Sequence, residues 1–332
     1  MRVAINGFGR IGRSILRLAM RSPDVEVVLI NDVAPIETCG YLFEFDSTFG
    51  TWPGDVEVIG STLRVDDAII PFFQQAEISG LDLKGVDVLL ECSGQPNSVE
   101  TARMGVSLGA ARALISGPAS LADITLVLGA NEERYRGEAV VSNASCTTNA
   151  LAPILRILDD TFSVIGGQMT TVHCYTGSQP TVDQPRDDLA RSRAAALSMV
   201  PTTTSAHRLL GTVLPGLAGR IEARALRVPT ASVSAIDLTV SIRRRTDIES
   251  IRHILFDAVE RSDVIGWIEK PLVSSDLRGR PESLVISGPE LSLAAAGGLL
   301  RIFGWYDNEW GFANRMLDMA RHISRYEKED QP

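Results

Sequence analysis

Cys146 is the residue of this sequence whose surroundings most favour covalent chemistry. It lies in the segment SNASCTTNALAP (142–153), where a β-rich run gives way to a helical apolar pattern. At a helix start the partial positive charge stabilises a thiolate, so we expect the pKa of this thiol to be lowered. The thiol also needs a group that takes its proton. His173 is the candidate base, because it alone of the four histidines lies in a predicted strand that leads into a long polar loop.

The other cysteines and histidines have no such surroundings. Cys174 neighbours His173 in one predicted strand and is expected to point to the opposite face, and Cys39 and Cys92 lie far from any such pattern. Taken alone, Cys146 would also be interpreted as a buried structural cysteine. The remaining histidines fall in predicted helices, as ordinary surface or packing residues. The cysteine spacing predicts neither disulfides nor a metal site and favours a reducing, cytoplasmic compartment.

A second candidate site is the glycine turn near the start of the chain. Gly7, Gly9 and Gly12 have the G-x-G-x-x-G spacing between a predicted strand and a predicted helix. Small residues there let a pyrophosphate approach the helix N-terminus. Asp32 ends the next strand, where a carboxylate accepts hydrogen bonds from ribose hydroxyls and repels a 2′-phosphate. The pattern predicts NAD rather than NADP; the alternative is a turn needed only for packing the helix on the strand.

A thiolate beside a nicotinamide indicates oxidation of an aldehyde. Attack of the sulfur on the carbonyl carbon gives a hemithioacetal, whose hydrogen leaves as hydride to the cofactor, and the product is a thioester. The polar segment GSQPTVDQPRDDLARSRAAA (177–196) has weak periodicity and is predicted to be a long ordered loop. Such loops commonly carry function.

The elements that must position these residues follow two patterns. Up to about residue 145, β-rich runs alternate with helical stretches, which predicts a parallel sheet covered by helices. We expect strands at 2–7, 25–32, 86–94, 112–118, 125–131 and 138–143, helices at 14–22 and 98–109, and an antiparallel excursion at 56–73. After residue 146 we expect an α+β domain with a large, mostly antiparallel sheet. Its predicted strands lie at 166–176, 221–230, 232–244 and 297–308, and its predicted helices at 147–160 and 247–261. An amphipathic helix is predicted at 309–328.

Composition limits the classes of partner. The 332 residues are 45% hydrophobic and carry 41 acidic against 32 basic side chains, which gives a formal net charge of -9. This charge disfavours nucleic acid and anionic membrane surfaces as partners. No apolar run approaches the ~20 residues of a membrane span, and the first residues are predicted to form a strand and a turn rather than a signal peptide. The length suits two domains.

Five blocks of the sequence resemble the glyceraldehyde-3-phosphate dehydrogenase family. They are INGFGRIGR (5–13), SNASCTTN (142–149), RAAALSMVPTTT (193–204), RVPT (227–230) and WYDNEWGFANR (305–315), in the family's order. The resemblance implies an α/β fold with a Rossmann-type NAD domain at 1–145, a catalytic α+β domain at 146–308, and a C-terminal helix at 309–332 that packs back onto the first domain. It also implies a homotetramer that converts glyceraldehyde 3-phosphate, inorganic phosphate and NAD to 1,3-bisphosphoglycerate.

The same resemblance assigns roles to individual residues. It makes Cys146 the nucleophile, His173 the base and Asn308 the residue that holds the nicotinamide carboxamide. The implied cofactor contacts are Gly7, Gly9, Arg10, Ile11, Gly12, Asp32, Ser93 and Ser116. The implied contacts to the substrate phosphate are Thr176, Ser178, Arg193 and Arg227, and those to inorganic phosphate are Ser145, Thr147, Thr204 and Ser205. Arginines and hydroxyls are the donors that an anionic substrate needs, although without the family such arginines would be ordinary ion-pairing residues.

Several positions depart from the family pattern. Ser205 replaces a usual glycine, Pro180 a common basic residue, Ala150 a frequent second cysteine and Phe49 a frequent histidine. Ala150 lies four residues after the thiol and matters little, whereas the other three leave the substrate and the use of phosphate open. One alternative is the related erythrose-4-phosphate dehydrogenase, which resolves its thioester with water. An alternative of another class is a non-catalytic NAD-binding regulator.

Overall fold

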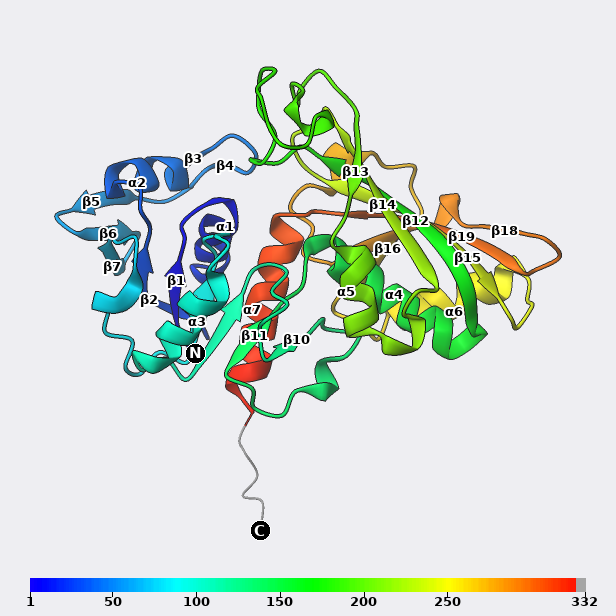
Figure 1. The fold of residues 1–332 in the computed structure, drawn as a ribbon, viewed down its shortest axis with the longest axis horizontal. Helices are drawn as coiled ribbons and strands as arrows, with labels where there is room; N and C mark the ends of the chain where they lie inside the picture. The colour runs from blue at the N-terminus through cyan, green and yellow to red at the C-terminus, as the bar shows by residue number, and fades with distance from the viewer. Residues whose placement is uncertain (327–332) are drawn as a thin grey trace, which may run out of the picture. The chain divides into compact units, whose positions relative to one another are not determined.

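The computed structural model describes residues 1–326, which fold into two compact units (Figure 1). Unit 1 contains residues 1–126, 133–144 and the described residues from Ala313 onward. Unit 2 contains Val127–Glu132 and Ser145–Phe312. The chain therefore leaves unit 1 to form unit 2 and returns to unit 1 with its last helix.

Unit 1 is organised around a nine-stranded sheet with the order β10-β11-β9-β8-β1-β2-β7-β6-β5. Its parallel strands include β1 (Arg2–Asn6), β2 (Glu26–Asn31), β8 (Val88–Glu91), β9 (Arg112–Ile115), β10 (Ile124–Thr125) and β11 (Val140–Ser142). Every residue of β8 is buried, as expected for a central parallel strand with both faces covered. The helices are α1 (Arg10–Ala19), α2 (Ile36–Glu44) and α3 (Ser98–Ser107). This arrangement confirms the predicted fold class of the first part of the chain.

The excursion predicted at 56–73 forms β5 (Val56–Ile59), β6 (Thr62–Val65) and β7 (Ala68–Phe73). These strands pair antiparallel with one another, but β7 also pairs in parallel with β2, so the excursion extends the main sheet. A separate ribbon joins β3 (Phe45–Asp46) to β4 (Gly50–Thr51). The strand predicted at 125–131 is wrong beyond β10, because the chain turns there and Gly129 has a φ of +79°.

Unit 2 contains an eight-stranded sheet with the order β13-β14-β12-β15-β19-β17-β16, in which β18 pairs with β19. Most neighbours are antiparallel, and β12/β14 and β16/β17 are parallel. The strands are β12 (Val164–Cys174), β13 (Val200–Thr203), β14 (Ile221–Val228), β15 (Ser234–Ile242), β16 (Ile265–Ile268), β17 (Leu284–Ser287), β18 (Ser292–Ala294) and β19 (Leu299–Tyr306). The predicted large, mostly antiparallel sheet is confirmed.

Three helices pack against this sheet (Figure 1). They are α4 (Cys146–Phe162) on β12, β15 and β17, α5 (Ala206–Val213) on β14, and α6 (Ile248–Val259) on β16. In β12, Met169, Thr171 and His173 are buried, and the residues between them are more exposed. This period-two alternation places His173 on the buried face of the sheet.

A long loop and the last helix complete the described chain. Between β12 and β13 the one regular element is a 3₁₀ turn at Ala190–Ser192, so the predicted loop is confirmed. Helix α7 (Trp310–Ser324) carries Arg321, which pairs with Asp24 of unit 1 at 2.7 Å. The helix predicted at 309–328 therefore ends earlier, and its positions beyond 326 lie outside the described residues. Within residues 1–326 no helix has the length and apolar character needed to cross a bilayer.

Candidate active site

Cys146 is the first residue of α4, which begins one residue before the helix predicted at 147–160. Ala144, two positions earlier, is fully buried with a φ of +55°, a left-handed conformation that costs a non-glycine residue about 1–3 kcal/mol. Ser145 caps the helix, because its Oγ accepts the N–H of Thr148 at 3.2 Å. A strained turn and a capped helix start thus present a half-buried free thiol.

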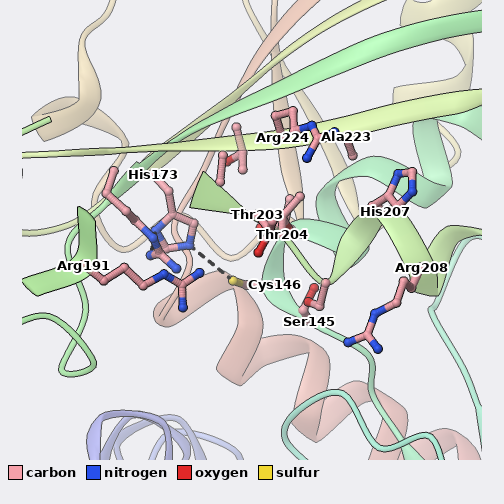
Figure 2. Close-up of a pocket in the computed structure, with 15 residues that line it drawn as sticks. Ser145, Cys146, His173, Arg191, Thr203, Thr204, His207, Arg208, Ala223 and Arg224 are labelled. Atoms are coloured by element: carbon pink, nitrogen blue, oxygen red, sulfur yellow. Dashed lines mark hydrogen bonds between the residues drawn. The ribbon is translucent and has the colours of Figure 1, made fainter. Parts of the chain in front are cut away.

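His173 faces the Cys146 sulfur. Its Nε2 lies 3.7 Å from Cys146 Sγ, within hydrogen-bonding distance for sulfur (Figure 2). Its Nδ1 lies 2.7 Å from the carbonyl oxygen of Cys174, a group that can only accept a hydrogen bond. In the tautomer that donates the Nδ1 hydrogen to this carbonyl, Nε2 presents a lone pair to the thiol. Arg227 Nη1 lies 3.1 Å from the same carbonyl and 2.6 Å from Nδ1, so its positive charge lies beside the imidazole ring.

Burial and Arg227 determine how this pair is protonated. Burial, and after it Arg227, lowers the pKa of His173 to about 4, so the imidazole is neutral at neutral pH. Burial raises the pKa of the Cys146 thiol, and Arg227 and the N–H groups at the start of α4 reverse only part of this rise. The predicted direction of the thiol pKa shift is therefore wrong, because burial outweighs the helix start. The resting pair is a thiol and a neutral imidazole that can accept its proton.

A cavity of about 510 Å³ lies over this pair within unit 2. Seven predicted site residues line it: Ser145, Cys146, Thr147, His173, Thr204, Ser205 and Arg227. The rest of the cavity wall is formed by eight further residues: Thr171, Arg191, Thr203, His207, Arg208, Ala223, Arg224 and Ala225. In Figure 2, Arg191 lies on the His173 side of the sulfur and Arg208 on the Ser145 side. Cations and hydroxyls on both sides of a nucleophile suit two anionic reactants.

Three predicted phosphate contacts do not line this cavity. The hydroxyls of Thr176 and Ser178 lie 2.9 Å apart and bond to each other. Arg193 is exposed, and its Nε lies 2.9 Å from Asp183. Arg191, two residues earlier, lines the cavity instead. The loop has no periodicity, so the sequence alone does not distinguish which arginine faces the thiol.

Sequence reasoning also missed basic residues near the start of α5. His207 lies in a helix as predicted, yet it lines the cavity together with Arg208. Glu222 contacts His207 Nδ1 at 3.5 Å and Arg224 at 2.7 Å, so one carboxylate holds both groups. Ser205 precedes α5 with a φ of −63°, so this position does not require the glycine usual in the family. The available signal was that α5 follows directly on the PTTT block.

The predicted glycine turn lies between β1 and α1 in unit 1. A Cβ at Gly7, which has a φ of +92°, would lie 2.4 Å from the backbone nitrogen of Ser93, and one at Gly12 would lie 2.2 Å from the carbonyl oxygen of Gly7. Both positions require glycine, because backbone packs on backbone there. A Cβ at Gly9 would meet nothing within 4 Å. The turn therefore leaves open space at the first N–H groups of α1, which fits a pyrophosphate.

Asp32 and Arg10 flank this turn. Asp32 follows β2, and its carboxylate accepts the N–H groups of Phe8 at 2.5 Å and Ala34 at 2.8 Å. This position is where an acidic residue binds ribose hydroxyls. Arg10 forms an ion pair with Asp46, and its guanidinium lies 5.4 Å from the centre of the Phe49 ring. Phe49, one of the departures from the family pattern, thus contacts a predicted cofactor residue.

The other predicted cofactor contacts lie at strand ends or beside the turn. Ile11 is in the first turn of α1. Ser93 follows β8, where its N–H donates to the Glu91 carboxylate at 3.0 Å, and Ser116 follows the neighbouring β9. The carboxyl ends of adjacent parallel strands form the edge at which dinucleotides bind. Asn308 belongs to unit 2, where it follows β19 and is buried.

Comparison with known proteins agrees with this chemistry. Residues 1–99 match the NAD binding domain model of glyceraldehyde 3-phosphate dehydrogenase, and residues 145–308 match the model of its C-terminal domain. The chain is 45% identical to glyceraldehyde-3-phosphate dehydrogenase of Xanthobacter flavus, over 96% of this chain and 97% of that protein. It is 42% identical to the Cereibacter sphaeroides protein of the same name, over 98% and 99% of the two chains. It is 39% identical to that of Geobacillus stearothermophilus, over 98% of each chain.

The glycine turn and the thiol–imidazole pair, together with these matches, define an NAD-dependent oxidoreductase. Within that class, the chain belongs to the glyceraldehyde-3-phosphate dehydrogenase family. The matched domains agree with the two-part fold, a parallel sheet followed by a mostly antiparallel one.

Proposed function

We propose that this chain oxidises glyceraldehyde 3-phosphate with NAD and transfers the acyl group to inorganic phosphate, which gives 1,3-bisphosphoglycerate. The observation that carries the proposal is the 3.7 Å approach of Cys146 Sγ to His173 Nε2 beside a cavity rich in arginine and hydroxyl groups. Membership of the family supports the same reaction. The non-catalytic alternative gains no support from a thiol and a base held within hydrogen-bonding distance.

The residues divide the reaction into four steps. His173 Nε2 accepts the thiol proton as Cys146 Sγ bonds to the aldehyde carbon, and the new alkoxide then takes that proton back. His173 next accepts the hydroxyl proton of this hemithioacetal. NAD, when bound, would supply the acceptor for the hydride that leaves the same carbon, which would leave a thioester on Cys146. A phosphate oxygen finally attacks the thioester, the C–S bond breaks, and the sulfur leaves as a thiolate that regains its proton from His173.

We assign the two anionic reactants to the donors around the sulfur. Inorganic phosphate is bound by four hydroxyl residues: Ser145, Thr147, Thr204 and Ser205. The substrate phosphate is bound by Arg227, and all five residues line the cavity. We assign to Arg191 the role predicted for Arg193, because Arg191 lines the cavity and Arg193 pairs with Asp183. The roles of Thr176 and Ser178 rest on the family resemblance alone.

Arg191 and Arg193 provide a matched pair of substitutions. We expect Arg191→Ala to raise the KM of at least one anionic reactant by about 10- to 100-fold, because it loses charge-assisted hydrogen bonds. We expect Arg193→Ala to change either KM by no more than about twofold, because its ion pair is exposed. Steady-state rates with varied aldehyde and varied phosphate give both constants. A larger effect at Arg193 than at Arg191 would reverse the assignment.

The proposed function is tested by omitting phosphate. Without phosphate or arsenate we expect a burst of about one NADH per active site, after which the thioester accumulates and the rate collapses. Adding either anion restores steady NADH formation. The comparison is made with glyceraldehyde 3-phosphate and with erythrose 4-phosphate. Equal steady rates with and without phosphate would contradict the proposal and indicate release by water.

We infer that four copies of the chain assemble. In the loop between β12 and β13, Val182, Leu189, Leu197 and Met199 expose large apolar side chains. Exposed large apolar side chains gathered in one loop support a protein–protein contact there, and the family resemblance implies a homotetramer. Light scattering after size-exclusion chromatography should give a mass close to four chains of 35.9 kDa. The mass of a single chain at assay concentration would contradict this inference.

We further propose that the chain has two functional domains. Residues 1–145 together with the last helix form the NAD domain, and residues 146–308 form the catalytic domain. The bounds of the two compact units support this proposal, except that Val127–Glu132 belong to unit 2. Cys39, Cys92, Cys146 and Cys174 are free, so we also propose a reducing, cytoplasmic location.

A further inference from the structure

The Asn308 amide is held by two buried side chains that have no role in the proposed reaction. Its Oδ1 accepts a hydrogen bond from Ser234 Oγ at 3.0 Å and another from Cys174 Sγ at 3.1 Å. Asn308 is 7% exposed, and Ser234 and Cys174 are each 1% exposed. The two lone pairs of the amide oxygen are therefore both used, away from bulk water.

The direction of each hydrogen bond follows from the available hydrogens. The backbone N–H of Cys174 donates to Ser234 Oγ at 3.2 Å, so the Ser234 hydroxyl hydrogen remains for Asn308. Burial raises the pKa of Cys174 to about 12, so its sulfur keeps a hydrogen to donate. Two donors thus point at one amide atom, which must be the oxygen, because an amide NH₂ group in the same place would face two donors.

The sheet brings these three residues together. Cys174 ends β12, Ser234 begins the adjacent β15, and Ser234 is paired in register with Tyr306, two residues before Asn308. Val233 precedes Ser234 with a φ of +66°, a conformation that a β-branched residue adopts only under strong constraint. The strain therefore lies at the residue immediately before the serine that donates to Asn308.

The other end of the amide is left available. Within the described part of the chain, Asn308 Nδ2 makes no hydrogen bond. With its oxygen fixed by two donors, Asn308 can offer only N–H groups to a ligand. A ligand at this position must therefore present an acceptor, such as a carbonyl oxygen.

We propose that Cys174 and Ser234 are positioning residues that lock the Asn308 amide by its oxygen, so that its nitrogen donates to the carboxamide oxygen of nicotinamide. The inference rests on the proposed function for the part that places nicotinamide at Asn308. Cys174 thereby contacts two groups at once: its carbonyl oxygen lies 2.7 Å from His173 Nδ1, and its thiol donates to Asn308.

The test uses the full chain, four variants at Cys174 and Ser234, and one control variant. Ser234→Ala and Cys174→Ala each remove one donor, and the double variant removes both. Cys174→Ser keeps a donor in the same position and tests rescue. Cys39→Ala is the matched control, because it removes another buried thiol that lies in α2 of unit 1. Dissociation constants for NAD and for ADP-ribose are measured by calorimetry. ADP-ribose lacks the nicotinamide ring, so damage to the rest of the nucleotide site would weaken both ligands.

We expect the double variant to bind NAD about tenfold more weakly and each single alanine variant about threefold more weakly, with ADP-ribose affinity unchanged. Cys174→Ser should recover most of the loss at Cys174→Ala, and Cys39→Ala should bind NAD like the parent. The inference is overturned if folded alanine variants keep the parent affinity for NAD, or lose affinity for both ligands equally. If the double variant does not fold, the single variants decide. The parent enzyme's NADH formation from the aldehyde separately tests the proposed function.

Discussion

Replacing Cys146 with serine is expected to reduce kcat by roughly a thousandfold or more, because an alcohol is a far weaker nucleophile than a thiol or thiolate. The structure adds a second reason. The proton must pass to a His173 whose pKa is lowered to about 4, and such a weak base deprotonates a serine hydroxyl even less readily than a thiol. NADH formation from the aldehyde under saturating phosphate measures the loss.

The control for this substitution is Cys39→Ala, which removes a free, buried thiol from unit 1 and should leave kcat within about twofold, because no step of the proposed reaction uses Cys39. Thermal unfolding of both variants checks that the fold persists. Serine is close to cysteine in size, so α4 should keep its start at residue 146. A Cys146→Ser enzyme with the parent rate would contradict the covalent mechanism altogether.

Replacing His173 with asparagine is expected to lower kcat by about 10²- to 10⁴-fold, the usual contribution of a positioned general base. Asparagine can still accept a hydrogen bond but cannot accept the proton. It is therefore a better test than alanine, which would also enlarge the cavity. The rate of Cys146 alkylation by iodoacetamide reports the first proton transfer without substrate or cofactor.

The pH dependence of this alkylation separates a base from a structural residue. With a pKa of about 4, the imidazole can accept the thiol proton until the pH falls to near that value. In His173→Asn the thiol must ionise unaided, and burial holds its pKa above the ordinary value. Its alkylation should then rise about tenfold per pH unit through the neutral and alkaline range. The alkylation rate of His173→Asn should fall furthest below that of the parent at low pH. Identical pH profiles for the two proteins would show that His173 does not take the proton.

Local sequence patterns predicted the elements that carry the chemistry. The change of period at Ser142–Asn149 places Cys146 at a helix start, and α4 begins there. Likewise α3 begins at Ser98 as expected. By contrast, α1 begins at Arg10 rather than at the predicted residue 14. Gly12 lies inside the first turn of α1, where a Cβ would be 2.2 Å from the Gly7 carbonyl oxygen, so the helix begins before the glycine spacing ends.

Properties that depend on distant parts of the chain could not be predicted in this way. The pKa of Cys146 reflects burial and the charge of Arg227, 81 positions away, and no local motif predicts either effect. Arg191 and Arg193 differ by two positions in a loop without periodicity, and only the folded loop shows that Arg191 lines the cavity. The hydrogen bonds of Asn308 likewise join residues 74 and 134 positions apart.

The return of α7 to unit 1 has a consequence for how the protein is made. In α7, the fully buried residues of unit 1 include Ala313, Met316, Ala320 and Ile323, although the rest of unit 1 comes from positions before Ser145. During translation the nucleotide-binding part emerges from the ribosome first, yet it cannot complete its core until the final helix has been synthesised. All residues of unit 2 are synthesised before this helix returns to unit 1, because unit 2 ends at Phe312. The nascent chain thus reverses the usual order in which an N-terminal domain is finished before the next one.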